Sequence, residues 1–110
     1  MSEPISLAER RRQSRLLFFN RRELNLLLSL YSRRVGAGEW RDYAIDHRPG
    51  MALFSVFRHS HDQPLYAIAK SLDGERRPLY RILAKGQKIK ESKDLDEALA
   101  AIERQLRVVS

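Results

Sequence analysis

The sequence contains no cysteine. This absence excludes a disulfide framework, a thiolate nucleophile and any metal site that is built from cysteine. Long hydrophobic runs are also missing, since a stretch such as the three leucines at residues 26–28 is far too short to span a bilayer. The start, Met1-Ser2-Glu3-Pro4, is followed by arginines and has no apolar core of a signal peptide. We therefore expect a cytoplasmic protein with no membrane contact.

The common catalytic and phosphate-binding motifs are absent as well. No serine lies in a Gly-x-Ser-x-Gly turn, and neither Gly-x-x-x-x-Gly-Lys-Ser nor Gly-x-Gly-x-x-Gly occurs. His59, His61 and Asp62 are close together in the sequence, but no further ligands follow at the spacing of a known metal site. We therefore expect no enzymatic activity, no cofactor and no bound metal.

Positive charge is in excess and unevenly placed. The 110 residues carry a formal net charge of +7. Residues 1–22 hold six arginines against two glutamates, and residues 60–86 hold five basic against three acidic residues. A basic balance favours association with an anionic partner, although it says nothing about the fold. We expect residues 1–14 to form a flexible basic arm and residues 15–110 to form a single domain.

Two amphipathic helices are predicted. Asn20 followed by Glu23 is typical of a capping box, and leucines then recur at helical spacing until Gly36, which predicts a helix over 21–36. Asp94 and Glu97 repeat the capping pattern ahead of a second helix over 94–107.

Four strands are predicted between the helices. They cover residues 40–47, 52–59, 65–72 and 79–85, and the short turns between them favour an antiparallel meander. Residues 15–19 could add a short leading strand. The expected fold is α+β, an antiparallel four-stranded meander packed with two amphipathic helices. The residues expected in its core are Leu24, Leu28, Tyr31, Phe54, Val56, Tyr66, Ile68, Tyr80, Ile82, Leu99 and Ile102.

One candidate polar site follows the first helix. Glu39, Trp40, Arg41 and Asp42 concentrate three charges beside the single tryptophan. Paired carboxylates there could form a site, with Trp40 packed against the C-terminal half of the helix. The structural alternative is an ordinary loop-to-strand junction, in which Trp40 packs on the helix and Arg41 pairs with an acid.

Six arginines are candidates for anion binding. Tyr66 and Tyr80 lie near some of them, and aromatic side chains beside cations are typical of single-strand binders. The alternative places both tyrosines in the core and the arginines in solvent. The candidates are Arg10, Arg11, Arg12, Arg76, Arg77 and Arg81.

The predicted helix–meander–helix order, with net positive charge, resembles the double-stranded RNA-binding domain in outline, in topology only. That domain holds phosphates with a basic N-terminus of its last helix. Here Asp94, Asp96 and Glu97 occupy that turn and would repel phosphate. The lysines before it are assigned to a loop: Lys85, Lys88, Lys90 and Lys93.

Three segments resemble a known family. They are Asn-Arg-Arg-Glu-Leu-Asn at 20–25, Gly-Glu-Trp-Arg-Asp-Tyr-Ala-Ile-Asp at 38–46 and Ala-Leu-Phe-Ser-Val-Phe-Arg at 52–58. The chain resembles the alphaproteobacterial domain-of-unknown-function 2794 family over about residues 16–108. This resemblance implies a bacterial, cytoplasmic, single-domain protein, and it supplies no catalytic residue or ligand.

Two functional hypotheses follow. The first is a non-catalytic protein-interaction module, which binds a protein partner or itself through a sheet edge or an apolar patch. The alternative is an accessory protein that binds nucleic acid through the arginine-rich arm and the basic stretch 60–86.

Overall fold

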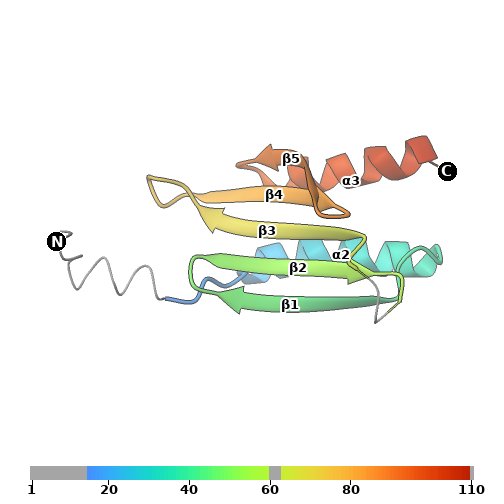
Figure 1. Cartoon of the computed structure of the whole chain (residues 1–110), viewed down its shortest axis with the longest axis horizontal. Coiled ribbons are helices and arrows are strands. Elements are labelled where there is room, and N and C mark those ends of the chain that lie inside the picture. Colours follow the sequence, from blue (N-terminus) through green and yellow to red (C-terminus); the bar gives the residue numbers. More distant parts are fainter. Residues whose placement is uncertain (1–14, 60–62, 110) are drawn as a thin grey trace.

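The fold is a five-stranded sheet with two helices. The computed structural model describes residues 15–59 and 63–109. The elements in chain order are α2 (Arg21–Gly36), β1 (Asp42–Arg48), β2 (Met51–Phe57), β3 (Tyr66–Leu72), β4 (Pro78–Ala84), β5 (Gln87–Ser92) and α3 (Leu95–Val109) (Figure 1). No helix in this part of the chain is both long and apolar enough to cross a membrane.

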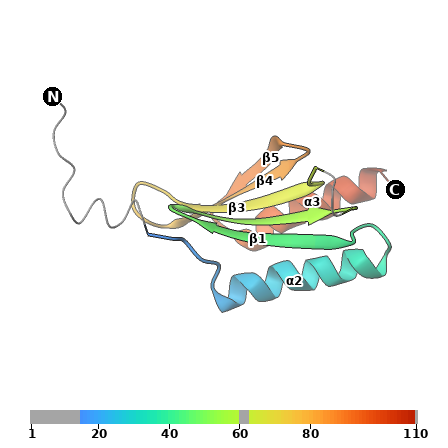
Figure 2. The ribbon, with the colours of Figure 1, turned by 60° about the horizontal axis from the view of Figure 1, so that its bottom comes forward.

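The strands follow one another across the sheet in sequence order. Every neighbouring pair is antiparallel, as the predicted meander requires. Both helices lie on the same side of the sheet, as Figures 1 and 2 show from two directions. Side chains of a strand alternate between its faces, so the same arrangement leaves the opposite face without a helix.

The sheet has one strand more than predicted. Lys85 and Gly86 both have positive φ and form a two-residue turn, after which β5 pairs with β4. The prediction of a loop at Lys88 and Lys90 is therefore wrong; Ile89 is the only large apolar residue of this strand, which has no alternating apolar pattern. Lysines are typical of an edge strand, where they discourage pairing with another sheet. The leading segment, in contrast, is no strand, since Leu16 forms only an isolated bridge with Pro49.

Hydrogen bonds at the helix starts confirm one predicted capping box and correct the other. Asn20 Oδ1 accepts the Glu23 N–H at 2.8 Å, and Glu23 Oε1 accepts the Asn20 N–H at 2.7 Å. At α3, Asp94 Oδ1 accepts the Asp96 N–H at 3.0 Å, while Glu97 accepts the Ser92 hydroxyl at 3.1 Å. The second cap therefore uses Asp94 alone, because Glu97 is engaged by β5.

The core lies between the sheet and the helices. The residues expected there from the strands and from α3 are buried: Phe54, Val56, Tyr66, Ile68, Tyr80, Ile82, Leu99 and Ile102. On α2 the prediction chose the wrong stripe. Glu23, Leu27 and Leu30 are buried, whereas Leu24, Leu28 and Tyr31 are only half-buried. The apolar residues of α2 are spread over more than one face, so periodicity alone could not rank them.

The loss of stability on truncating a leucine of α2 should depend on whether that leucine lies on the buried stripe of the helix. Leu27→Ala removes a fully buried side chain and should lower the free energy of unfolding by about 2–5 kcal/mol. Leu28→Ala is the matched control on the next residue, and its half-buried side chain should cost clearly less. Urea melts of both variants measure the difference, and equal losses would contradict the assignment of the buried stripe.

Candidate functional site

A cavity opens at one end of the sheet, on the side of the helices. Its volume is about 670 Å³, within the range of small-molecule sites. Six segments of the chain meet there, and the lining residues are Glu39, Trp40, Arg58, Leu65, Tyr66, Ala84, Lys85, Gln87, Ile89, Gln105 and Leu106. The cavity therefore has apolar walls with a few polar groups among them.

Local contacts hold the wall of this cavity in place. Trp40 is 1% exposed and packs against Tyr66, with ring centroids 6.0 Å apart. The Tyr66 hydroxyl donates to Gln105 Oε1 at 2.7 Å, which ties β3 to α3. Burial, followed by the negative charge of Glu39, raises the pKa of Tyr66, so its hydroxyl stays protonated near neutral pH.

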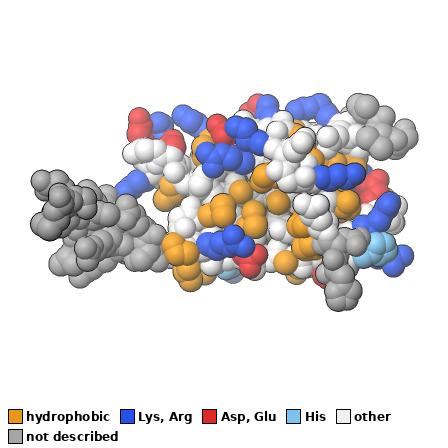
Figure 3. Space-filling view, in the orientation of Figure 1, with side chains coloured by type: hydrophobic (Ala, Val, Ile, Leu, Met, Phe, Trp, Pro, Cys, Tyr) orange, Lys and Arg blue, Asp and Glu red, His pale blue; other side chains and the backbone are white. Residues whose placement is uncertain are grey.

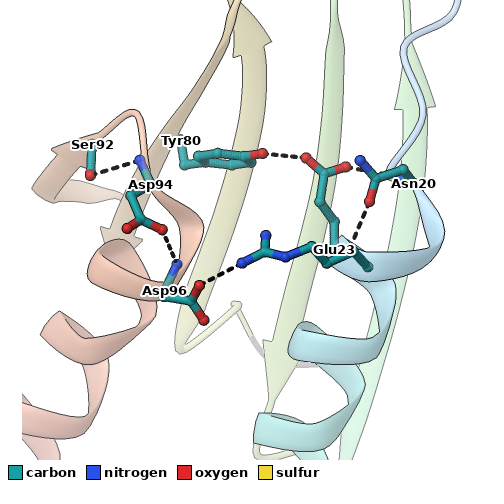
Figure 4. A network of polar contacts seen from close by, with 7 residues as sticks. Asn20, Glu23, Tyr80, Ser92, Asp94 and Asp96 are labelled. Carbon is teal, nitrogen blue, oxygen red and sulfur yellow. Dashed lines mark hydrogen bonds and ion pairs between the residues drawn. The ribbon is translucent and has the colours of Figure 1, made fainter.

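A second polar cluster lies at the opposite end of α2 and is buried. The side chains of Glu23 and Lys70 are 1% and 8% exposed, and their charged groups are 2.7 Å apart. Lys70 Nζ also donates to the Phe18 carbonyl at 2.8 Å, and the Tyr80 hydroxyl donates to Glu23. Figure 4 shows Tyr80 and Asn20 pointing at the Glu23 carboxylate from the sheet and from the helix cap.

The cluster anchors α2 to the centre of the sheet. Burial raises the pKa of Glu23, but hydrogen bonds from Lys70, Tyr80 and the Asn20 backbone outweigh it and leave this pKa below its ordinary value. Burial and the same carboxylate raise the pKa of Tyr80. Glu23 and Lys70 are almost fully enclosed, so a substrate cannot reach the cluster. We therefore interpret it as a structural ion pair.

The uncovered face of the sheet is a third candidate surface. Its register aligns Asp46, Leu53, Ala69, Arg81 and Glu91 in one row across the five strands. The adjacent row contains Ala44, Ser55, Ala67, Leu83 and Lys88. Small and apolar side chains thus occupy the centre, and charged ones lie toward β1 and β5. Figure 3 shows hydrophobic side chains spread over the middle of this face.

Comparison with known proteins identifies the family. The model of a protein family of unknown function, "Protein of unknown function (DUF2794)", matches residues 17–99. The chain belongs to the DUF2794 family. No curated protein and no solved structure matches the chain.

The matched region contains the buried cluster, the uncovered face and almost all of the cavity. It spans α2, all five strands and the start of α3, so it contains the buried cluster and the uncovered face. Of the cavity, only Gln105 and Leu106 lie beyond it.

The predicted polar site of this DUF2794 chain is divided between two surfaces. Glu39 and Trp40 line the cavity, and Trp40 packs against Tyr31 of α2 as expected, with ring centroids 6.4 Å apart. Arg41 is exposed, and its backbone N–H donates to the Phe57 carbonyl. Asp42 is exposed at the start of β1, where its carboxylate accepts the Tyr43 N–H. Glu39 pairs with Arg34, at 3.3 Å, rather than with Arg41.

The arginine candidates are also dispersed. Arg76 lies in the turn between β3 and β4, where its φ is 64°. Arg77 pairs with Asp73 and Glu75, and Arg81 pairs with Glu91 at 2.9 Å on the uncovered face. Tyr66 and Tyr80 face the core, as the alternative interpretation expected. Arg10, Arg11, Arg12, His61 and Asp62 lie outside the described residues.

Sequence reasoning missed the buried cluster and most of the cavity wall. Glu23 was recognised only as a cap, because its partners Lys70 and Tyr80 are 47 and 57 residues away. A lysine inside a predicted strand, directly after the apolar residues Ile68 and Ala69, is the one signal of a buried charge. Within the described residues, no three His, Cys, Asp or Glu side chains are grouped as a metal site.

The buried ion pair predicts a pH-dependent cost of removing Lys70. Lys70→Met leaves the Glu23 carboxylate buried without its cation, which should cost about 3–5 kcal/mol at neutral pH. In the parent chain the pKa of Glu23 is lowered, so its stabilisation exists above the unfolded pKa of about 4.3 and is lost as pH falls. In the variant burial raises that pKa, and protonation then favours the folded state. The stability deficit should therefore shrink toward pH 4.

Urea melts of both proteins at pH 7 and pH 4 measure this change. The matched control is the double variant Glu23→Gln/Lys70→Met, which removes both charges and should cost less at pH 7 than Lys70→Met alone. A deficit that is the same at both pH values would contradict the role of Glu23 as a buried anion.

Proposed function

We propose that this chain is a non-catalytic protein-interaction module that binds a second copy of itself through the uncovered face of the sheet. The observation that supports this proposal is the helix-free face with a small and apolar centre (Figure 3). Monomeric proteins rarely expose large contiguous apolar patches, and such patches are typical of interaction sites.

The centre of the face suits packing of one sheet on another. Ser55 and Ala69 are only 5% and 6% exposed although no helix covers them. Leu53 and Arg81 flank Ala69 in register, and Ser55 lies between Leu53 and Phe57 on the same face of β2. Small residues in the middle and larger apolar residues around them allow two sheets to approach to about 10 Å and to interdigitate.

The charges at the margins favour a copy of the same chain in one orientation. On β1, the exposed Asp42 and Asp46 outnumber Arg48, whereas Arg81 and Lys88 share the single carboxylate Glu91 on the other side. A two-fold axis parallel to β3 places β1 of one copy over β5 of its partner. Because this axis overlays equivalent rows of the two copies, Lys88 of one copy lies over Ala44 of its partner. It then lies between Asp42 and Asp46 of the partner.

The face is a better site than either sheet edge. The outer strand β5 contributes Lys88 and Lys90 next to its free edge, and lysine at an edge opposes strand addition. At the other edge, the Leu17 N–H donates to the carbonyl of Arg48, the last residue of β1, and the Arg15 carbonyl accepts the Gly50 N–H of the following turn. The leading segment therefore caps one end of β1.

Sedimentation equilibrium of charge variants tests the dimer. Asp46→Lys and Lys88→Glu should each raise the dimer dissociation constant several-fold, since every substitution enters a two-fold interface twice. The combined variant should recover most of the loss because the opposite charges are exchanged. Leu53→Lys, at the apolar centre, should raise the constant more than tenfold.

Asn25→Lys is the control for Leu53→Lys, because it adds the same single positive charge on the exposed side of α2. A monomeric parent chain at all concentrations, or a combined variant no better than the single ones, would overturn the face-to-face dimer. Circular dichroism of each variant establishes that the fold is retained.

The nucleic-acid alternative has less support from the described residues. Arg77 and Arg81 already pair with carboxylates, Arg76 lies in the turn between β3 and β4, and the other three candidates lie in residues 1–14. If this alternative held, affinity for labelled duplex DNA would fall steeply with salt, by about 0.9 in the log–log slope for each neutralised phosphate. Deletion of residues 1–14 would then reduce the slope, whereas the dimer constant would stay the same.

A further inference from the structure

We propose that the cavity at the end of the sheet binds a small amphipathic anion, a carboxylate attached to an apolar body such as a medium-length acyl chain. This inference is independent of the proposed dimer, because the cavity is on the side of the helices and the proposed interface is on the other side of the sheet (Figure 2).

The size and walls of the cavity define the apolar part of the ligand. The volume of about 670 Å³ is ample for a chain of eight to ten carbons, a drug-sized molecule by volume. Trp40, Leu65, Tyr66, Ala84, Ile89 and Leu106 supply the apolar walls. Ile89 is 38% exposed, and contact with a ligand would bury it further.

The charges around the cavity define the polar end of the ligand. Arg58 and Lys85 both line it, and neither forms an ion pair with a carboxylate of residues 15–59 or 63–109. The one acidic lining residue, Glu39, is neutralised by Arg34 at 3.3 Å. The cavity therefore presents two cations that a carboxylate can bridge by charge-assisted hydrogen bonds.

The backbone at Lys85 is a second observation in favour of a binding role. Lys85 has φ 50° in the two-residue turn before β5, a conformation that asparagine and glycine adopt with less strain. Strained backbone positions are often found at ligand sites, and this one lies in the wall of the cavity. The Lys85 N–H also donates to the Leu65 carbonyl at 3.1 Å, which fixes the turn against another cavity residue.

The single tryptophan provides the readout. Trp40 is the only tryptophan of the chain and lines the cavity, so its fluorescence reports on occupancy directly. Octanoate, used below its critical micelle concentration, is the probe. Two comparison ligands have the same apolar body: octan-1-ol carries no charge, and octylammonium carries the opposite charge. Octanoate should change the emission saturably, octanol should bind more weakly, and octylammonium should bind weakest.

Two substitutions test the polar end. Lys85→Asn suits the turn and should leave stability unchanged or improved, and Arg58→Gln keeps a polar side chain of similar length. Each should weaken octanoate binding about tenfold, on the basis of one charge-assisted hydrogen bond, with little effect on octanol. Lys93→Gln is the control, because Lys93 is exposed and outside the cavity.

Three results would overturn the proposal. They are an octanoate titration without saturation, octylammonium binding as tightly as octanoate, and equal octanoate binding by the parent chain and the Lys85→Asn/Arg58→Gln variant. Because the readout is ligand binding, such a result leaves the dimer untouched, and a monomeric chain leaves the cavity untouched. The two proposals can therefore fail separately.

Discussion

A sheet has two faces, and two helices on one side of it can cover only one of them. In this chain α2 and α3 both pack on the face that carries Phe54, Ile68 and Ile82, which are essentially inaccessible to solvent. Strand alternation then determines which residues lie on the other face, since each residue that faces the helices is followed by one that faces away from them. The solvent-facing rows, with their small and apolar centre, are a direct consequence of that one-sided packing.

The same packing explains why a buried ion pair is tolerated. Glu23 is on the buried stripe of α2 and faces a sheet whose other central residues are apolar, so an unpaired carboxylate there would be costly. Lys70 from β3 and Tyr80 from β4 satisfy it, and Asn20 completes the set from the helix start. These partners fix the position of α2 on the sheet. Apolar contacts are not directional, and with them alone the helix could slide along the sheet.

Local patterns predicted most of the fold, and contacts between distant segments account for what they missed. The Asn20–Glu23 cap and the strands of the meander follow from short-range rules that the sequence displays. β5 was not predicted because it is an edge strand with lysines in place of the alternating apolar residues of a core strand. The candidate site was predicted in part: Glu39 and Trp40 line the cavity, but its other walls come from five further segments. No spacing rule brings Arg58, Lys85 and Gln105 together.

The end of β2 shows how one sheet can separate the two proposed binding surfaces. Phe57 belongs to the uncovered face, because it pairs with Asp42 in the register that places Ser55 and Leu53 there. The next residue, Arg58, lines the cavity on the side of the helices. Neighbouring residues point to opposite sides of an extended chain, so a partner seated on the face would leave the mouth of the cavity open. Two copies related by an axis parallel to β3 would carry their cavities at the same end of the assembly, both accessible to a ligand.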